Sequence, residues 1–220
     1  MKGVTKSHHA YVLEGKREAS LSLLKAYLEN EWGVSLLANP DVIEHTFQTL
    51  SVDDARKIKQ QAITKPLGKE KIFILITNFL GREAQNALLK VLEEPVAHTY
   101  FFILIPSSEV LLPTVRSRVI EITLETRDVE DIVSPKKFLK ASGEERLKLL
   151  SSFLSHESES KKSDLIAFLG SLEKELALKK EVREVREGLA SLLMYKKYLF
   201  DQSPSIKMIA EFLALTLPIV

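Results

Sequence analysis

Short apolar runs alternate with helix-type spacings of apolar residues along residues 1–125. Residues 72–76 and 100–105 are continuously apolar, and both runs are far shorter than the roughly 20 residues that a membrane-spanning helix needs. Apolar runs of this length, without polar alternation, are typical of parallel strands whose two faces are both covered by helices. We therefore predict two central strands of a parallel sheet here.

The segments between and around these runs predict further strands and helices. Leu21, Leu24 and Leu28 share one face of a helix predicted at residues 18–30, and Ser51 with Asp54 forms the capping box that begins another. We predict the remaining strands at 9–13, 45–50 and 119–124, a helix at 82–95 ended by its proline, and a short helical turn within 109–118. This alternation predicts a layered α/β fold with a parallel sheet and right-handed crossovers.

After residue 125 the strand signals stop and only helical spacings remain. Ser134 before Pro135, and Ser142 with Glu145, indicate helix starts. Apolar stripes follow at 165–176 and 182–199, a polar loop is expected at 156–164, and Ser203 with Pro204 is expected to begin the last helix. We predict an α/β domain at 1–127, a polar linker at 126–135 and an all-helical domain at 135–220.

The amino-acid composition indicates which class of protein this is, but it says little about the function. The chain has 220 residues, 45% of them hydrophobic and 28% charged, which is typical of a globular protein. It has no cysteine, which excludes disulfides, thiolate catalysis and cysteine-ligated zinc and fits a reducing cytoplasm. The N-terminal residues lack the pattern of a secretory signal.

The net charge is +1, so attraction to nucleic acid has to come from a local patch. Residues 56–71 hold six basic side chains and one acidic one, which fits either a solvated helix face or a patch for nucleic acid.

The expected places for a nucleotide-hydrolysing site hold the wrong residues. The first strand is followed by Gly15 and Lys16, without the second glycine or the Lys-Ser/Thr pair of a phosphate loop. The third strand ends at Thr77 and Asn78, where Mg²⁺ would require carboxylates. We therefore expect no bound nucleotide, no metal ion and no other cofactor.

Several segments resemble a known family. AQNALLKVLEEP at 84–95, the strand at 100–105 and LLPTVRSRV at 111–119 are similar to the clamp-loader subunits of bacterial DNA polymerase III, an AAA+ family. The similarity extends to SHHAYVLEG near the N-terminus and, in 138–154 and 204–218, to the family's helical collar. The resemblance implies a P-loop-NTPase-like core that lacks its phosphate loop, followed by the collar, in the manner of the delta-prime branch.

The chain departs from the family pattern between its two domains. Family members carry a small helical lid there, whereas only about ten residues, 125–134, are available in this chain. The family's cysteine after the arginine is replaced by Val119, and its zinc-binding insertion is absent. A deleted lid agrees with a subunit that holds no nucleotide.

The resemblance also implies roles for individual residues. Arg118 matches the arginine finger that reaches the nucleotide of a neighbouring subunit; the alternative is that it caps the preceding helix or pairs with Glu121, while Arg116 is read as a surface residue. The remaining matches are the sensor-like Ser107 and Ser108, for which a turn role is the alternative, and Arg56 and Lys57, which match the region facing DNA.

The same resemblance implies partners and a place of action. The expected partners are ATP-binding subunits of the gamma/tau type and a delta-like subunit, with the sliding clamp and primer-template DNA contacted through the assembly. No membrane partner is expected, and the expected location is the cytoplasm. An autonomous ATPase with an unrecognised site and a divergent adaptor outside replication remain as alternatives.

The histidines and two aromatic residues carry no predicted catalytic role. We expect surface or interdomain positions for the histidines and core positions for Trp32 and Phe47; the histidines are His8, His9, His45, His98 and His156.

Overall fold

The computed structural model describes residues 3–124, 134–155, 161–178, 182–200 and 204–220, without the side chains of 152–155 and 161. The chain divides into two compact units, residues 1–127 and 128–220. Residues 126–133, which are most of the predicted linker, lie outside the described residues, as does residue 125.

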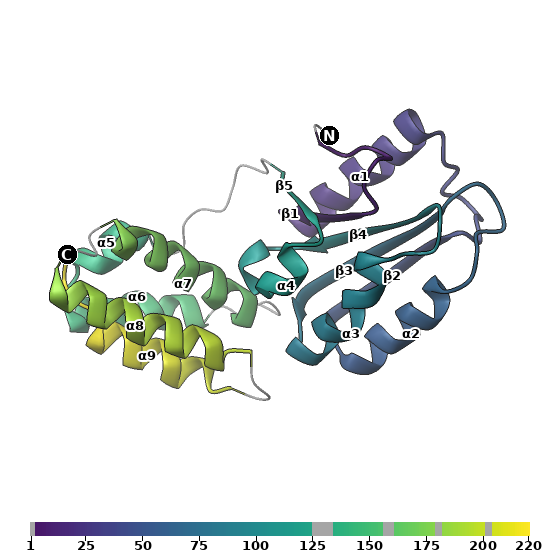
Figure 1. Cartoon of the computed structure of the whole chain (residues 1–220). Coiled ribbons are helices and arrows are strands. Elements are labelled where there is room, and N and C mark those ends of the chain that lie inside the picture. Colours follow the sequence, from purple (N-terminus) through teal and green to yellow (C-terminus); the bar gives the residue numbers. More distant parts are fainter. Residues whose placement is uncertain (1–2, 125–133, 156–160, 179–181, 201–203) are drawn as a thin grey trace. The chain divides into compact units, whose positions relative to one another are not determined.

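The first unit is built on a five-stranded sheet in which every pairing is parallel (Figure 1). The strand order is β2-β3-β4-β1-β5, so the two continuously apolar runs are interior strands, as predicted. The strands are β1 (Ala10–Glu14), β2 (Val42–Leu50), β3 (Lys71–Leu80), β4 (Thr99–Ile105) and β5 (Ile120–Thr123).

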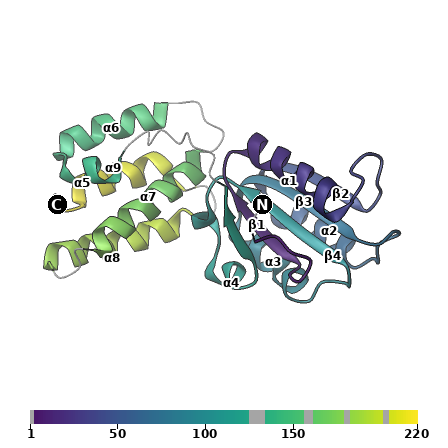
Figure 2. The same cartoon turned by 90° about the horizontal axis from the view of Figure 1, so that it is seen from above.

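Helices cover both faces of this sheet, which explains why residues 72–76 of β3 and 100–105 of β4 are continuously apolar. Helix α1 (Arg17–Trp32) lies on one face, and α2 (Val52–Ala62) and α3 (Arg82–Glu93) lie side by side on the other (Figures 1 and 2). Under α1, alternate strand residues such as Ile74 and Phe102 pack with Leu24 and Leu28. The predicted α/β fold is confirmed.

The capping signals read from the sequence are present at both predicted positions. The Asp54 amide donates to Ser51 Oγ at 3.2 Å, and the Ser51 amide donates to Asp54 Oδ2 at 3.1 Å. The Ser51 hydroxyl bond is the largest of the effects that lower the pKa of Asp54. In the second unit, the Ser142 amide donates to Glu145 Oε2 at 2.9 Å, so the capping box there is also confirmed.

The second unit contains only helices among its described residues (Figure 2). They are α5 (Pro135–Lys140), α6 (Gly143–Ser155), α7 (Lys161–Ala177), α8 (Arg183–Tyr198) and α9 (Ile206–Thr216).

Two predicted boundaries in this unit are wrong. The loop predicted at 156–164 is too long, because α7 already begins at Lys161; residues 156–160 lie outside the described residues. The last helix begins at Ile206 with Ser205 as its N-cap, where Ser205 Oγ accepts the Met208 amide at 3.4 Å. Of the predicted start, Pro204 precedes this cap and Ser203 lies outside the described residues.

A buried arginine joins three elements of the helical unit. Arg146 on α6 is only 1% exposed, and its guanidinium donates to the carbonyl oxygens of five residues at the ends of α5 and α9. These acceptors are Phe138, Leu139, Ala214, Leu217 and Pro218. Burial lowers the pKa of Arg146. Carbonyl groups at helix C-termini lack partners within the helix, so this side chain satisfies groups that the fold would otherwise leave unpaired.

Candidate functional site

The carboxyl edge of the sheet is the place where α/β folds of this type hold ligands. At this edge β1 ends at Glu14 and β4 ends at Ile105, and the following Gly15 amide donates to the Ile105 carbonyl at 3.1 Å. A phosphate cradle needs several backbone amides that face the anion. Here the glycine amide is committed to the neighbouring strand, and a carboxylate stands beside it.

The end of β3 offers no ligand for a hard cation. The strand extends to Leu80, three residues beyond the predicted end at Thr77. Thr77 is buried and its hydroxyl donates to the Phe79 carbonyl at 2.8 Å. In the part of the chain that the structure describes, no group of three or more histidine, aspartate or glutamate side chains is placed to hold a metal ion.

Arg116 is fixed within a group of acidic residues. Its Nε donates to Glu121 Oε1 at 2.8 Å and its Nη2 to Glu121 Oε2 at 2.9 Å, which is a bidentate ion pair. The bond to Glu121 is the largest cause of the raised pKa of Arg116, and the charges of Glu109 and Glu14 add to it. The Arg116 side chain is 39% exposed, which agrees with its prediction as a surface residue, and this arginine, not Arg118, pairs with Glu121.

Arg118 lies after helix α4 (Pro113–Arg116) and pairs with the end of α3 instead. Its Nε and Nη2 both lie 2.9 Å from Glu93 Oε2, and its Nη1 donates to the Thr114 carbonyl at 2.9 Å. The bond from Nη1 to the Thr114 carbonyl caps α4, which is one of the alternative roles considered for Arg118 in the sequence analysis. The Arg118 side chain is nevertheless 30% exposed, and its partner Glu93 is 55% exposed.

Two histidines of the N-terminal segment lie against the Arg118 region. Desolvation by burial, followed by the charge of His9, lowers the pKa of His8, and the nearby Arg118 backbone partly opposes this shift. His9 Nε2 lies 2.7 Å from the Leu92 carbonyl on α3. Both rings are half-buried, so each lies neither in the core nor fully exposed to solvent.

The other aromatic and histidine predictions have mixed outcomes. Trp32 and Phe47 are both only half-buried; Trp32 packs edge-on against Tyr100 and Phe102 of the core. His45 is half-buried and hydrogen-bonds Gln61, whereas His98 is exposed. His156 lies outside the described residues.

The two sensor-like serines are buried in the turn after β4. Ser107 and Ser108 are each 6% exposed, and Ser107 Oγ accepts the Glu109 amide at 3.3 Å as the cap of the short helix η1 (Ser108–Val110). Ser107 therefore makes the backbone contact expected of a turn residue.

Gln85 was not singled out from the sequence, although it organises the same region. It is fully buried on α3; its amide nitrogen donates to the Leu80 and Val110 carbonyls, and its amide oxygen accepts the Leu112 amide. One side chain thus joins the end of β3 to the segment that carries Arg118. A glutamine inside an apolar helical stripe is the signal that could have revealed it.

The two candidate DNA-binding residues are exposed on α2. Arg56 pairs with Asp53 at 3.0 Å, and this pair is open to solvent. Lys57 is also exposed. Lys71, the last residue of the basic stretch, is buried and donates to the Gln61 and Thr64 carbonyls at the end of α2, so it does not belong to a surface patch.

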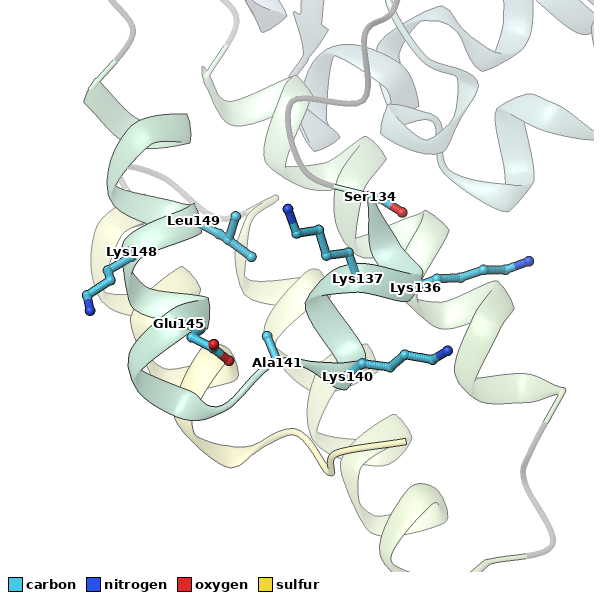
Figure 3. Close-up of a pocket in the computed structure, with 8 residues that line it drawn as sticks. All are labelled: Ser134, Lys136, Lys137, Lys140, Ala141, Glu145, Lys148 and Leu149. Atoms are coloured by element: carbon cyan, nitrogen blue, oxygen red, sulfur yellow. The ribbon is translucent and has the colours of Figure 1, made fainter.

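A groove of about 800 Å³ lies beside α5 and α6 in the helical unit. Four lysines line it, but Figure 3 shows Lys136 and Lys140 projecting to the same side of α5, away from α6. Glu145, in the same groove, is engaged by its capping box. The lysines do not converge on one point, so we assign no ligand to this groove.

Helices α8 and α9 expose a strip of apolar side chains, which we call the α8–α9 strip. On α9, Met208, Phe212 and Leu215 follow one another at helical spacing and are 38–65% exposed. Tyr195 on α8 packs against Phe212 on α9, with 4.5 Å between the ring centroids. The Tyr195 centroid also lies 5.8 Å from that of Tyr198 on the same helix. We treat this exposed apolar surface as a candidate site for association with another protein. None of the described helices is long and apolar enough to cross a bilayer.

Comparisons with known proteins agree with the sequence resemblance. The family model described as "DNA polymerase III, delta subunit" matches residues 35–128. The gamma subunit of Buchnera aphidicola is 29% identical over 174 residues, which are 67% of this chain and 48% of that protein. The delta' subunit of Escherichia coli is 40% identical over 72 residues, 32% of this chain and 22% of that protein.

The chain spans less than half the length of these curated relatives, and only 23% of the tau subunit of Salmonella typhimurium, which is 31% identical over 57% of this chain. Two solved structures align with nearly the whole chain. A gamma subunit-related protein of Thermotoga maritima has a TM-score of 0.45 at 17% identity, covering 95% of both chains. The clamp loader delta protein of Bacillus subtilis has a TM-score of 0.39 at 12% identity, covering 96% of this chain and 95% of that one.

The family model and the curated relatives converge on one group of replication proteins. The chain is thus identified as a relative of the clamp-loader subunits of DNA polymerase III.

Proposed function

We propose that this protein is a non-hydrolysing, delta-prime-like subunit of a DNA polymerase sliding-clamp loader. It assembles with ATP-binding subunits of the gamma/tau type and a delta-like subunit, and it offers Arg118 to the nucleotide of a neighbour. Through that assembly it acts on the sliding clamp and primer-template DNA in the cytoplasm. Catalysis belongs to the neighbouring subunit, so the chain by itself is not an enzyme.

One observation carries this proposal: the chain keeps a partly exposed arginine after α4, while its own nucleotide site is unsuited to phosphate. The Gly15 amide is used by the Ile105 carbonyl, and Glu14 lies at the same edge. The Arg118 side chain is 30% exposed, so part of it faces solvent. A planar guanidinium matches the charge on phosphoryl oxygens and can act across a subunit boundary.

Assembly through the helical unit is supported by the α8–α9 strip. The strip lies on the outer surface of two adjacent helices, and Lys196 nearby is held by Glu173 at 2.9 Å. A partner that covered the strip would remove Met208, Phe212 and Leu215 from water. Full burial of an exposed side chain of this kind contributes roughly 1.5–3 kcal/mol. These three side chains are already partly buried, so each contributes less than that before the entropy of association is subtracted.

Reconstitution with the chain's own ATP-binding partner tests the arginine role. The Arg118→Ala variant should lower DNA-stimulated ATP hydrolysis at least ~10-fold, since arginine fingers supplied in trans contribute about 10³–10⁵ in rate elsewhere. Arg183→Ala, which removes an exposed arginine of α8 with its own Glu187 pair, serves as the matched control. An unchanged rate for Arg118→Ala in a fully assembled complex would rule the finger out.

Nucleotide binding by the isolated chain tests the non-hydrolysing part of the proposal. Titration with ATP and Mg²⁺ should give no saturable binding up to millimolar concentration, because the segment after β1 lacks the second glycine and the Lys-Ser/Thr pair of a phosphate loop, and the Gly15 amide is bonded to Ile105. Micromolar affinity would instead favour an autonomous ATPase with an unrecognised site.

A further inference from the structure

We propose that Glu93 is a positioning residue that holds Arg118 against its own subunit, so that the neighbour's phosphate must displace this carboxylate before the arginine can act. This inference rests on the proposed function of Arg118. It adds a second residue, on a different element, to the same site.

The contacts of Arg118 account for its donor groups. Nε and Nη2 both face Glu93 Oε2, and Nη1 donates to the Thr114 carbonyl, with Ser117 Oγ at 3.3 Å. An arginine binds phosphate with the same planar set of N–H groups that it presents to a carboxylate. Glu93 therefore occupies the part of the guanidinium that phosphoryl oxygens require, and the two anions compete for it.

The neighbouring Arg116 pair has a different geometry, although the Arg116 side chain is 39% exposed and the Arg118 side chain 30%. Arg116 uses both oxygens of Glu121, whose side chain is 25% exposed, and has Glu109 and Glu14 nearby as well. Arg118 uses one oxygen of Glu93, whose side chain is 55% exposed. Solvent-facing ion pairs are weak and are screened by salt, so the Glu93 contact can be exchanged at small cost.

The backbone around Arg118 is held independently of this ion pair. The Arg118 amide donates to the Val115 carbonyl at 2.9 Å. Release from Glu93 therefore needs only rotation of the side chain. The Arg118 backbone stays in place while its guanidinium exchanges Glu93 for phosphate.

Arginine modification of the isolated chain tests the ion pair without any partner. Phenylglyoxal labelling, quantified by mass spectrometry, should increase ~2–5-fold at Arg118 in Glu93→Gln, as expected for loss of a solvent-facing ion pair. Labelling at Arg116 should stay unchanged in that variant. The matched control, Glu121→Gln, should show the reverse pattern. Equal labelling of Arg118 in wild type and Glu93→Gln would overturn the proposal.

A double-mutant cycle in the assembled complex tests the competition itself. Glu93→Gln should raise DNA-stimulated hydrolysis ~2–5-fold when the arginine has to leave Glu93, and the gain should vanish in the Arg118→Ala background. Glu187→Gln, which removes the exposed pair with Arg183, should leave the rate unchanged.

The outcomes separate this inference from the proposed function. If Arg118→Ala lowers the rate but Glu93→Gln leaves it unchanged or slower, the competition is disproved and the finger stands. If Arg118→Ala has no effect, the finger itself fails, and the labelling experiment alone decides whether Glu93 restrains Arg118.

Discussion

Replacing Arg146 by methionine should be among the most damaging single changes in the helical unit. Methionine keeps most of the aliphatic volume of the side chain but removes every donor. The five carbonyl groups that accept hydrogen bonds from Arg146 would then lose their donor. Water cannot easily replace it, because the Arg146 side chain is only 1% exposed.

Two opposing contributions set the expected change in the free energy of unfolding: the hydrogen bonds of Arg146 and the cost of burying its charge. Hydrogen bonds from a charged group contribute roughly 1.5–3 kcal/mol each, but burying the guanidinium offsets much of their sum. Breaking a buried charged network typically lowers the free energy of unfolding by about 3–5 kcal/mol. For a unit of this size, each kcal/mol corresponds to roughly 4–8 °C in Tm, so a fall of at least ~12 °C is expected.

Urea unfolding of the whole chain, followed by circular dichroism at 222 nm, measures the loss. The single tryptophan of the chain, Trp32, lies in the first unit, so its fluorescence follows that unit separately. Arg183→Met, at a side chain that is 84% exposed, is the control and should change the free energy of unfolding by less than ~0.5 kcal/mol. An Arg146→Met protein that matches this control would refute the reasoning.

Three further predictions concern the first unit. Gln85→Leu should lower the free energy of unfolding by about 2–4 kcal/mol in urea titrations, because the Leu80 and Val110 carbonyls and the Leu112 amide lose their partner; a loss below ~0.5 kcal/mol would contradict this. The pKa of His8 is lower in the folded than in the unfolded chain, so the unfolded chain binds the proton first as pH falls from 7 to 5. Stability should fall over that range and level off below the folded pKa, and His8→Gln should flatten the slope; an equal slope in both proteins would exclude His8 as its source. Ser51→Ala should cost about 1 kcal/mol in thermal unfolding and raise the pKa of Asp54 toward its ordinary value, as measured by NMR titration; an unshifted Asp54 would count against the capping box.

The sheet and most helices could be predicted because their signals are local. The apolar run of β3 requires cover on both faces, and the Ser51 and Ser142 capping boxes each lie within four residues. The start of α9 was misplaced by two residues because Ser203-Pro204 and Ser205 carry similar capping signals, and only the backbone decides between them.

The sequence could identify individual residues of the site but not the partners that they contact. Those contacts join parts of the chain that are distant in sequence. Arg118 and Glu93 are separated by 25 positions, and nothing local distinguishes Glu93 from the adjacent Glu94. Which of Arg116 and Arg118 meets Glu121 depends on how α4 turns into β5. Arg146 looks like any polar residue on an amphipathic helix until α9 packs over it.

The α8–α9 strip has a consequence for how the protein is made. A chain that leaves Met208, Phe212 and Leu215 in water favours any contact that covers them, including contacts with other copies of itself. Overproduction of the chain alone should therefore favour aggregation or proteolysis.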